Sequence, residues 1–208
     1  AEAEEELQAA LAEFDTVLPG PHALKGNAYN NLGLAAKSRG DYRLATERFE
    51  EALRQKRSSL AEDHQQVGTA YLNLGMALRG LGELQRAEAA FDSSLAILEA
   101  RLPPGHSYFA TLHNNLGQLY RAIGQIARAI EQYQAAIRYG KADENWALVA
   151  AAHNNLGLAL RDDGSMTEAE GCFRRAIQLD PDQATYYIGR SNARRVQNNL
   201  IGAVADLT

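Results

Sequence analysis

The sequence predicts an all-α protein built from repeated helical hairpins, and three observations lead to this fold class. First, the dipeptide Leu-Gly returns at Leu32, Leu74, Leu116 and Leu156, at spacings of 42, 42 and 40 residues. Second, each of its glycines is followed at fixed distances by another glycine, an alanine, an aromatic residue and a small residue. Third, the apolar residues of each copy fall at helical spacing. A period of this length indicates a repeat architecture, because each copy is one supersecondary unit.

The first helix of each copy precedes the second glycine. In the first copy, Tyr29, Leu32 and Ala36 form an apolar stripe. Gly40 ends this helix, because its position favours a positive φ. A glycine inside a helix is less stable than alanine by about 1 kcal/mol. Gly33 therefore predicts a close approach between two helices, with Ala45 opposite it.

The second helix follows the turn, and its apolar face in the first copy consists of Leu44, Ala45, Phe49, Ala52 and Leu53. The same face recurs at the start of the chain, where the pattern of a second helix comes without a first helix. A degenerate fifth copy closes the chain, with Ser191 and Asn198 in place of the two glycines. We therefore expect both ends to be cut from a longer array.

This pattern resembles the tetratricopeptide repeat, whose helix-turn-helix signature has an aromatic residue, Leu-Gly, a turn glycine, alanine, an aromatic residue and alanine at these offsets. The long period, and connectors that end in His22, His64 and His106, are similar to the sub-group of kinesin light chains and Pins-type adaptors. The connector from Lys141 to Trp146 departs from that pattern. The resemblance implies a right-handed superhelical solenoid of about ten helices, stabilised through interfaces between neighbouring repeats.

We expect a single array of these repeats over residues 1–208. It begins with the second helix of a truncated repeat, continues with four repeats and ends in a partial fifth repeat. These parts are expected at residues 1–18, 22–60, 64–102, 106–141, 145–181 and 184–208.

Composition and motifs exclude several classes of function. The 208 residues carry a net charge of -5, whereas a protein that binds nucleic acid usually has a basic face. No apolar run approaches the roughly 20 residues that span a membrane. The single cysteine, Cys172, excludes an internal disulfide and fits a reducing compartment, so we expect a cytoplasmic protein. The sequence has no phosphate-binding loop and no other catalytic motif, so we expect neither an enzyme nor a cofactor.

The histidines do not form a pattern that predicts a metal site. His22, His64 and His106 are separated by one repeat each, on the order of 10 Å, which is too far to share an ion. We expect them to cap helices or to lie in turns. His113 and His153 occupy the aromatic column, where we expect packed rings with one nitrogen in a hydrogen bond.

An asparagine ladder lies on the other face of the first helices, which we expect to line a concave groove. It consists of Asn31, Asn73, Asn115 and Asn155, with Asn30, Asn114 and Asn154 beside three of them. An amide both donates and accepts hydrogen bonds, so such a row can bind the backbone of an extended peptide. The resemblance implies the same role. Alternatively, these amides bond between neighbouring repeats.

A basic column accompanies the ladder, and it consists of Lys37, Arg79, Arg121, Arg161 and Arg195. Guanidinium groups in this column can pair with Asp or Glu of a bound peptide. Alternatively, the column reflects the helix dipole, which favours a cation in the last turn by about 0.3–1 kcal/mol. We also place Gln118 in the groove, between the side chains of the ladder and the basic column.

The sequence therefore predicts a scaffold or adaptor that binds an extended, acidic segment of a protein partner in the concave groove. The carboxylate clamp of chaperone-binding relatives is absent from the columns of Asn30 and Leu34. Two other hypotheses are a sensing or autoinhibitory segment of a larger signalling protein, and self-association through the truncated terminal repeats.

Overall fold

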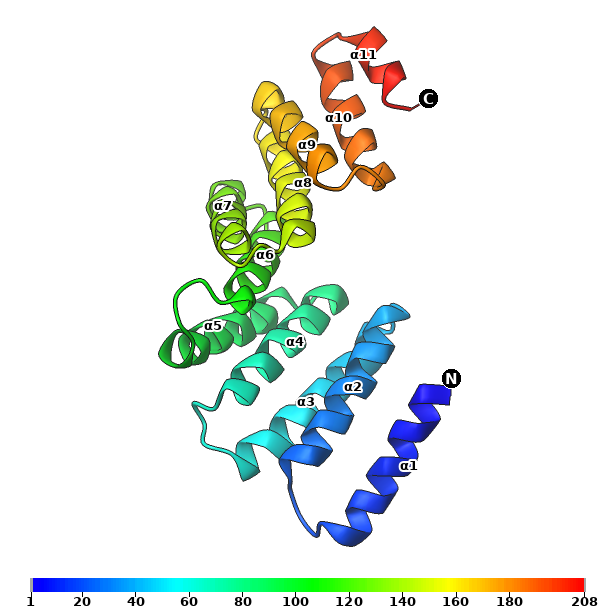
Figure 1. Ribbon diagram of the computed structural model, residues 1–208, viewed down its shortest axis with the longest axis vertical. Helices are drawn as coiled ribbons and strands as arrows, with labels where there is room; N and C mark the ends of the chain where they lie inside the picture. The colour runs from blue at the N-terminus through cyan, green and yellow to red at the C-terminus, as the bar shows by residue number, and fades with distance from the viewer. Residues whose placement is uncertain (1, 208) are drawn as a thin grey trace. The chain divides into compact units, whose positions relative to one another are not determined.

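The structure, a computed structural model, describes residues 2–207, with side chains from residue 6 onward. Over that range the chain forms eleven α-helices and no strand, which confirms the all-α fold class (Figure 1). This number agrees with the expected solenoid of about ten helices, and the short last helix falls within the partial fifth repeat.

The helices pack into two compact units. Unit 1 ends at Pro103 and contains α1 (Glu2–Val17), α2 (Ala23–Ser38), α3 (Tyr42–Ser59), α4 (Gln65–Leu81) and α5 (Leu84–Arg101). Unit 2 begins at Pro104 and contains α6 (Ser107–Ala122), α7 (Ile126–Ala142), α8 (Trp146–Asp162), α9 (Met166–Leu179), α10 (Ala184–Val196) and α11 (Leu200–Ala205).

Within each unit every helix packs against the next one along the chain. The first helices of neighbouring repeats also meet, since α2 contacts α4, α6 contacts α8, and α8 contacts α10. This arrangement places the predicted ladder residues of neighbouring repeats next to one another within a unit. The continuation of the repeats as one array through both units stays a prediction.

The turns between paired helices have the predicted left-handed residue. Gly40 has a φ of 78° and Gly82 a φ of 87°. In the fifth copy Asn198 replaces this glycine and adopts a φ of 61°. Asparagine is one of the few residues with a side chain that enters this region readily, so the degenerate copy keeps the same turn.

The glycine of each Leu-Gly dipeptide lies where two helices approach closely, as predicted, but the group opposite it is not the alanine. A Cβ atom on Gly33 would lie 2.6 Å from Cε1 of Phe49, so the ring packs directly on the glycine backbone. The prediction of Ala45 as the opposing residue was wrong. Ala45 and Phe49 are both fully buried between α2 and α3. The glycine thus makes room for an aromatic ring, which fills more space than a methyl group.

Unit 2 ends in a network of largely buried charges that attaches α11. The Asp206 carboxylate, 2% exposed, accepts hydrogen bonds from Arg190 Nε at 3.0 Å and from Arg194 Nη1 at 3.1 Å. Arg194 Nε also donates to Glu170 of α9, at 2.9 Å. A buried carboxylate needs such partners, because an unpaired buried charge is strongly destabilising. Among residues 2–207, none of the helices has both the length and the apolar character that crossing a membrane requires.

Candidate functional site

All the predicted groove residues lie on the first helices of the repeats. Unit 1 contributes Asn30, Asn31 and Lys37 from α2, and Asn73 and Arg79 from α4. Unit 2 contributes the residues of α6, α8 and α10, which are Asn114, Asn115, Gln118, Arg121, Asn154, Asn155, Arg161 and Arg195. These residues form one surface in each unit, and the two surfaces are called the first-helix faces.

The asparagines of unit 1 form a pair across two first helices. Asn73 Nδ2 on α4 donates to Asn30 Oδ1 on α2, at 2.7 Å. Both side chains are half-buried, whereas Asn31 on the next position of α2 is exposed. The pair fixes the orientation of both amides and leaves each amide further donor and acceptor capacity.

The same pair recurs in unit 2. Asn155 Nδ2 on α8 donates to Asn114 Oδ1 on α6, at 3.0 Å. Asn115 is buried, and its Nδ2 donates to the backbone oxygen of Thr111 at 2.8 Å. Oδ1 of Asn154 is buried and accepts no hydrogen bond from the described residues. The alternative that these amides bond between neighbouring repeats is therefore realised for two pairs.

In unit 1 the basic column places two cations close together. Lys37 Nζ lies 3.7 Å from the sulfur of Met76, on the neighbouring first helix. Burial lowers the pKa of Lys37, and the nearby Arg79 guanidinium lowers it further. A carboxylate that approached this pair would favour the charged form of Lys37 and so raise its pKa.

In unit 2 two members of the column share a carboxylate. Arg121 Nε donates to Asp162 Oδ2 at 2.6 Å, and Arg161 Nη2 donates to Asp162 Oδ1 at 3.0 Å. Arg195 is exposed and lines an open pocket of about 470 Å³ together with Arg161 and Asn192. Val196 and Leu200 supply the apolar part of this pocket. It therefore offers cationic, amide and apolar groups to a ligand.

Sequence reasoning missed both Asp162 and Asn192 as residues of this surface. Asn192 falls in the column of Leu34, Met76, Gln118 and Leu158, one position after the degenerate glycine column. Its place in this column was a signal from which Asn192 could have been predicted to lie on the first-helix face. Every member of the basic column also lies in the last turn of its helix, as the helix-dipole alternative requires.

The connector histidines are N-terminal caps, which confirms that expectation. Nδ1 of His22, His64 and His106 accepts a hydrogen bond from the backbone N–H two residues later, at 3.2, 3.1 and 3.3 Å. Each ring satisfies one of the orphan donors at the start of α2, α4 and α6. Among the described residues, no three His, Cys, Asp or Glu side chains gather into a group that could hold a metal ion.

The two histidines of the aromatic column differ. His113 stacks on Tyr139, with ring centroids 5.2 Å apart, and its Nδ1 lies 2.7 Å from Gln132 Oε1. This confirms the expected packed ring. For His153 the expectation of one satisfied nitrogen was wrong, because both ring nitrogens are buried without a hydrogen-bond partner among the described residues. Burial, with smaller contributions from Lys141 and Arg175, lowers the pKa of His153 to about 4.

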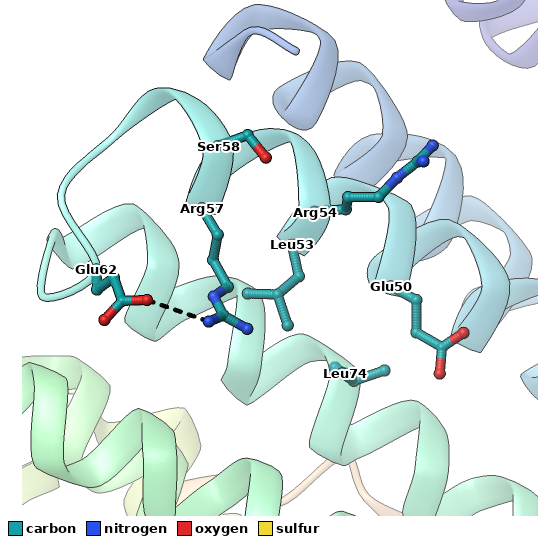
Figure 2. A pocket seen from close by; sticks show the side chains of 7 residues that line it. All are labelled: Glu50, Leu53, Arg54, Arg57, Ser58, Glu62 and Leu74. Atoms are coloured by element: carbon teal, nitrogen blue, oxygen red, sulfur yellow. Dashed lines mark hydrogen bonds and ion pairs between the residues drawn. The ribbon is translucent and has the colours of Figure 1, made fainter.

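A further pocket, of about 510 Å³, lies between α3 and α4 and has no predicted groove residue among its described lining residues (Figure 2). Figure 2 shows Arg57 extending to Glu62, with which it forms an ion pair at 3.2 Å. Leu53 and Leu74 form its apolar wall, and Glu50 lies at the far side from Glu62. Its charges of opposite sign give it no clear preference for an acidic ligand.

Solved structures share this fold. A putative kinesin light chain from Podosopora anserina, described as having nearly identical TPR-like repeats, is 17% identical with a TM-score of 0.75, and the match covers 89% of this chain and 93% of that one. BtubC (BKLC) from P. vanneervenii is 18% identical with a TM-score of 0.77, covering 99% and 84%. MamA (41-end) from Desulfovibrio magneticus RS-1 is 23% identical with a TM-score of 0.63, covering 88% and 91%. At these identities the likeness concerns the fold.

Family comparison covers almost the whole chain. One tetratricopeptide repeat model matches residues 1–58, 24–100 and 66–142, and a second matches residues 114–195. No curated protein matches the sequence. The predicted resemblance is confirmed, and kinesin-light-chain-like proteins are among its structural neighbours. With helical hairpins, matching repeat models and solved structures of the same architecture in agreement, the chain belongs to the tetratricopeptide repeat family.

Proposed function

We propose that this protein is a scaffold or adaptor that binds an extended, acidic segment of a protein partner on its first-helix faces. Repeat proteins of this class present extended surfaces to partners, which supports a role in protein–protein interaction. The observation that carries the finer proposal is the asparagine pair that recurs in both units, at 2.7 Å and 3.0 Å. Paired amides are held in one orientation, so the hydrogen-bonding groups that remain are prearranged for a peptide backbone.

The basic column supplies the preference for acidic residues. It lies on the same helices as the asparagines, seven residues after Asn30 in the case of Lys37 and six residues after Asn155 in the case of Arg161. Cations that are half-buried or line a pocket pair more strongly with a carboxylate than fully exposed ones, because less solvent screens them. Arg195 and Asn192 in their pocket are well placed to receive such a group in unit 2.

The test uses a random peptide library that is selected on the whole chain, followed by affinity measurement with the selected peptides. Arg195→Glu and Asn155→Ala are expected to weaken binding by about tenfold each, through charge reversal and loss of an amide. Arg174→Glu is the matched control, because it makes the same charge change at an exposed position of α9. Selected peptides without acidic residues, or equal affinity for Arg195→Glu and Arg174→Glu in folded protein, would contradict the proposal.

Self-association is a second candidate, favoured by exposed apolar residues at the end of unit 2. Ile201 is 90% exposed, and Val196, Leu200 and Val204 are each more than half exposed. Exposed apolar surface beyond scattered single residues marks protein interaction sites. Light scattering at several concentrations tests it: the mass should rise with concentration, and Ile201→Glu should abolish the rise. A constant monomer mass would exclude self-association.

A further inference from the structure

Asp162 is an acidic residue within the basic column of unit 2. It is the last residue of α8, and its two oxygens are used by different arginines. Oδ2 accepts from Arg121 Nε of α6 at 2.6 Å, and Oδ1 accepts from Arg161 Nη2 at 3.0 Å and from its Nε at 3.3 Å. The three side chains are 29–32% exposed, so they lie at the surface where a ligand would meet the column.

An acidic residue at this position is peculiar to the fourth copy. The residue after the basic one is Ser38, Gly80, Ala122 and Val196 in the other copies. The helix dipole does not explain Asp162, because a carboxylate in the last turn of a helix is disfavoured. The structure shows another stabilising interaction for Asp162, which is its pairing with two arginines on neighbouring first helices.

Two neighbouring cations of the basic column, such as Arg121 and Arg161, form what we call a rung. A carboxylate held between the two guanidinium groups has the arrangement that a Glu or Asp of a bound peptide would adopt at this rung. We propose that Asp162 occupies the Arg121–Arg161 rung in place of a ligand carboxylate and thereby determines which rungs accept acidic residues. This inference rests on the proposed function, because it assumes that acidic segments bind the first-helix faces. A carboxylate of a bound peptide would meet two arginines that are already paired, and it would be repelled by the charge of Asp162. Acidic residues of the peptide therefore bind this rung weakly.

The consequence for specificity is a shift of the acidic position away from Arg121. In unit 2, Arg195 lies beyond this rung, in the pocket that also contains Asn192. In unit 1, Lys37 on α2 and Arg79 on α4 are close enough for the Arg79 guanidinium to lower the pKa of Lys37. Removing the charge of Asp162 should open the Arg121–Arg161 rung to a ligand carboxylate and raise affinity for acidic peptides.

The test compares Asp162→Asn with Asp163→Asn in the whole chain. Asp163 is the next residue and is exposed, and its Oδ2 accepts from Ser165 Oγ at 3.0 Å. The two variants change net charge equally, so any difference between them isolates the contact with the arginines. The probe is a fluorescein-labelled peptide of alternating glutamate and alanine, with binding followed by fluorescence anisotropy.

We expect Asp162→Asn to bind this peptide about fivefold more tightly than Asp163→Asn, since competition by one partly exposed ion pair is of that order. The advantage should shrink as salt is raised. Equal affinities of the two variants overturn the inference. If Arg195→Glu still weakens binding while Asp162→Asn behaves like Asp163→Asn, the proposed function stands and only this inference fails.

A second measurement does not depend on any ligand. Nitrogen-15 NMR of arginine side chains should show the Nε–H of Arg121 protected from exchange in the wild type and in Asp163→Asn. In Asp162→Asn this protection should be lost, because the neutral amide is a weaker acceptor. An unprotected Arg121 Nε–H in the wild type would contradict the pairing on which the inference depends.

Discussion

At the scale of single residues, the two histidines of the aromatic column show how one neighbour changes the chemistry of a site. His113 has Gln132 beside it, 19 residues later, and the residue 19 positions after His153 is Cys172. Thiols are weak hydrogen-bonding groups, so this copy lacks the partner that the preceding copy has. The position of the ring was predictable from the column, but its missing partner depended on a residue outside the signature.

His153 predicts a loss of stability in mild acid. Its pKa is about 4 in the folded chain, below the ordinary value of 6.5. Between these values the unfolded chain binds more protons, so the free energy of unfolding falls as pH drops from 6.5 to 4. The loss should be about 2 kcal/mol once partial exposure of the ring is allowed for.

Urea unfolding of wild type and His153→Tyr at pH 7 and pH 4.5 measures this effect. Tyrosine is the residue that the column has in the first two copies, at Tyr29 and Tyr71. Carboxylates titrate in the same range in both proteins. The difference between the two proteins in how the free energy of unfolding changes with pH therefore isolates the contribution of His153. Identical pH dependence of the two proteins would show that His153 makes no such contribution.

Cys172→Gln should supply the missing partner. By analogy with the Gln132 contact to His113 at 2.7 Å, a glutamine at this position can bond one nitrogen of His153. We expect the free energy of unfolding at pH 7 to rise by about 1 kcal/mol, the net value of a hydrogen bond to a buried polar group. Thermal unfolding measures this change, with Cys172→Leu as the control, and equal midpoints of the two variants would refute the explanation.

At the scale of helices, the spacing of each hairpin is set by an aromatic ring against glycine. A Cβ on Gly117 would lie 2.6 Å from Tyr133 Cδ1, whereas one on Gly171 would meet nothing within 4 Å. Gly117→Ala should therefore lower the free energy of unfolding by about 1–2 kcal/mol, because overpacking outweighs the gain in helix propensity.

Gly171→Ala in α9 is the matched control and should raise the same quantity by about 0.5–1 kcal/mol. Opposite signs for the two substitutions, measured by urea unfolding, are the signature of close helix packing at Gly117. If both substitutions stabilise the protein, the ring does not limit the spacing of the hairpin.

Histidines cap the N-termini of the first helices α2, α4 and α6. His64 accepts from the N–H of Gln66 at 3.1 Å, so His64→Ala should reduce stability by about 1 kcal/mol. His64→Asn keeps a side-chain acceptor at the same position and should retain most of it. Equal destabilisation by alanine and asparagine in thermal unfolding would assign the effect to something other than capping.

At the scale of the whole molecule, the period predicted the helices and the family. The packing residues of the first hairpin, Leu32, Gly33 and Phe49, have counterparts of the same kind in each of the four full copies. The division into two units could not be predicted, since the spacing of 42 residues continues across Pro103 and Pro104. Nor could the contact of Asp162 with Arg121, because it joins two copies 41 residues apart. The signature records packing inside a repeat, whereas these features depend on side chains outside it.

The net charge of -5 is also distributed unevenly, since the first helices carry a basic column. If the proposed function holds, these helices, and not the second helices, receive the partner. Amide chemical-shift mapping of the whole nitrogen-15-labelled chain, titrated with a selected acidic peptide, tests it most directly. We expect shifts concentrated on α2, α4, α6, α8 and α10, including the side-chain amides of Asn73 and Asn155. Shifts confined to α3, α5, α7 and α9 would contradict it.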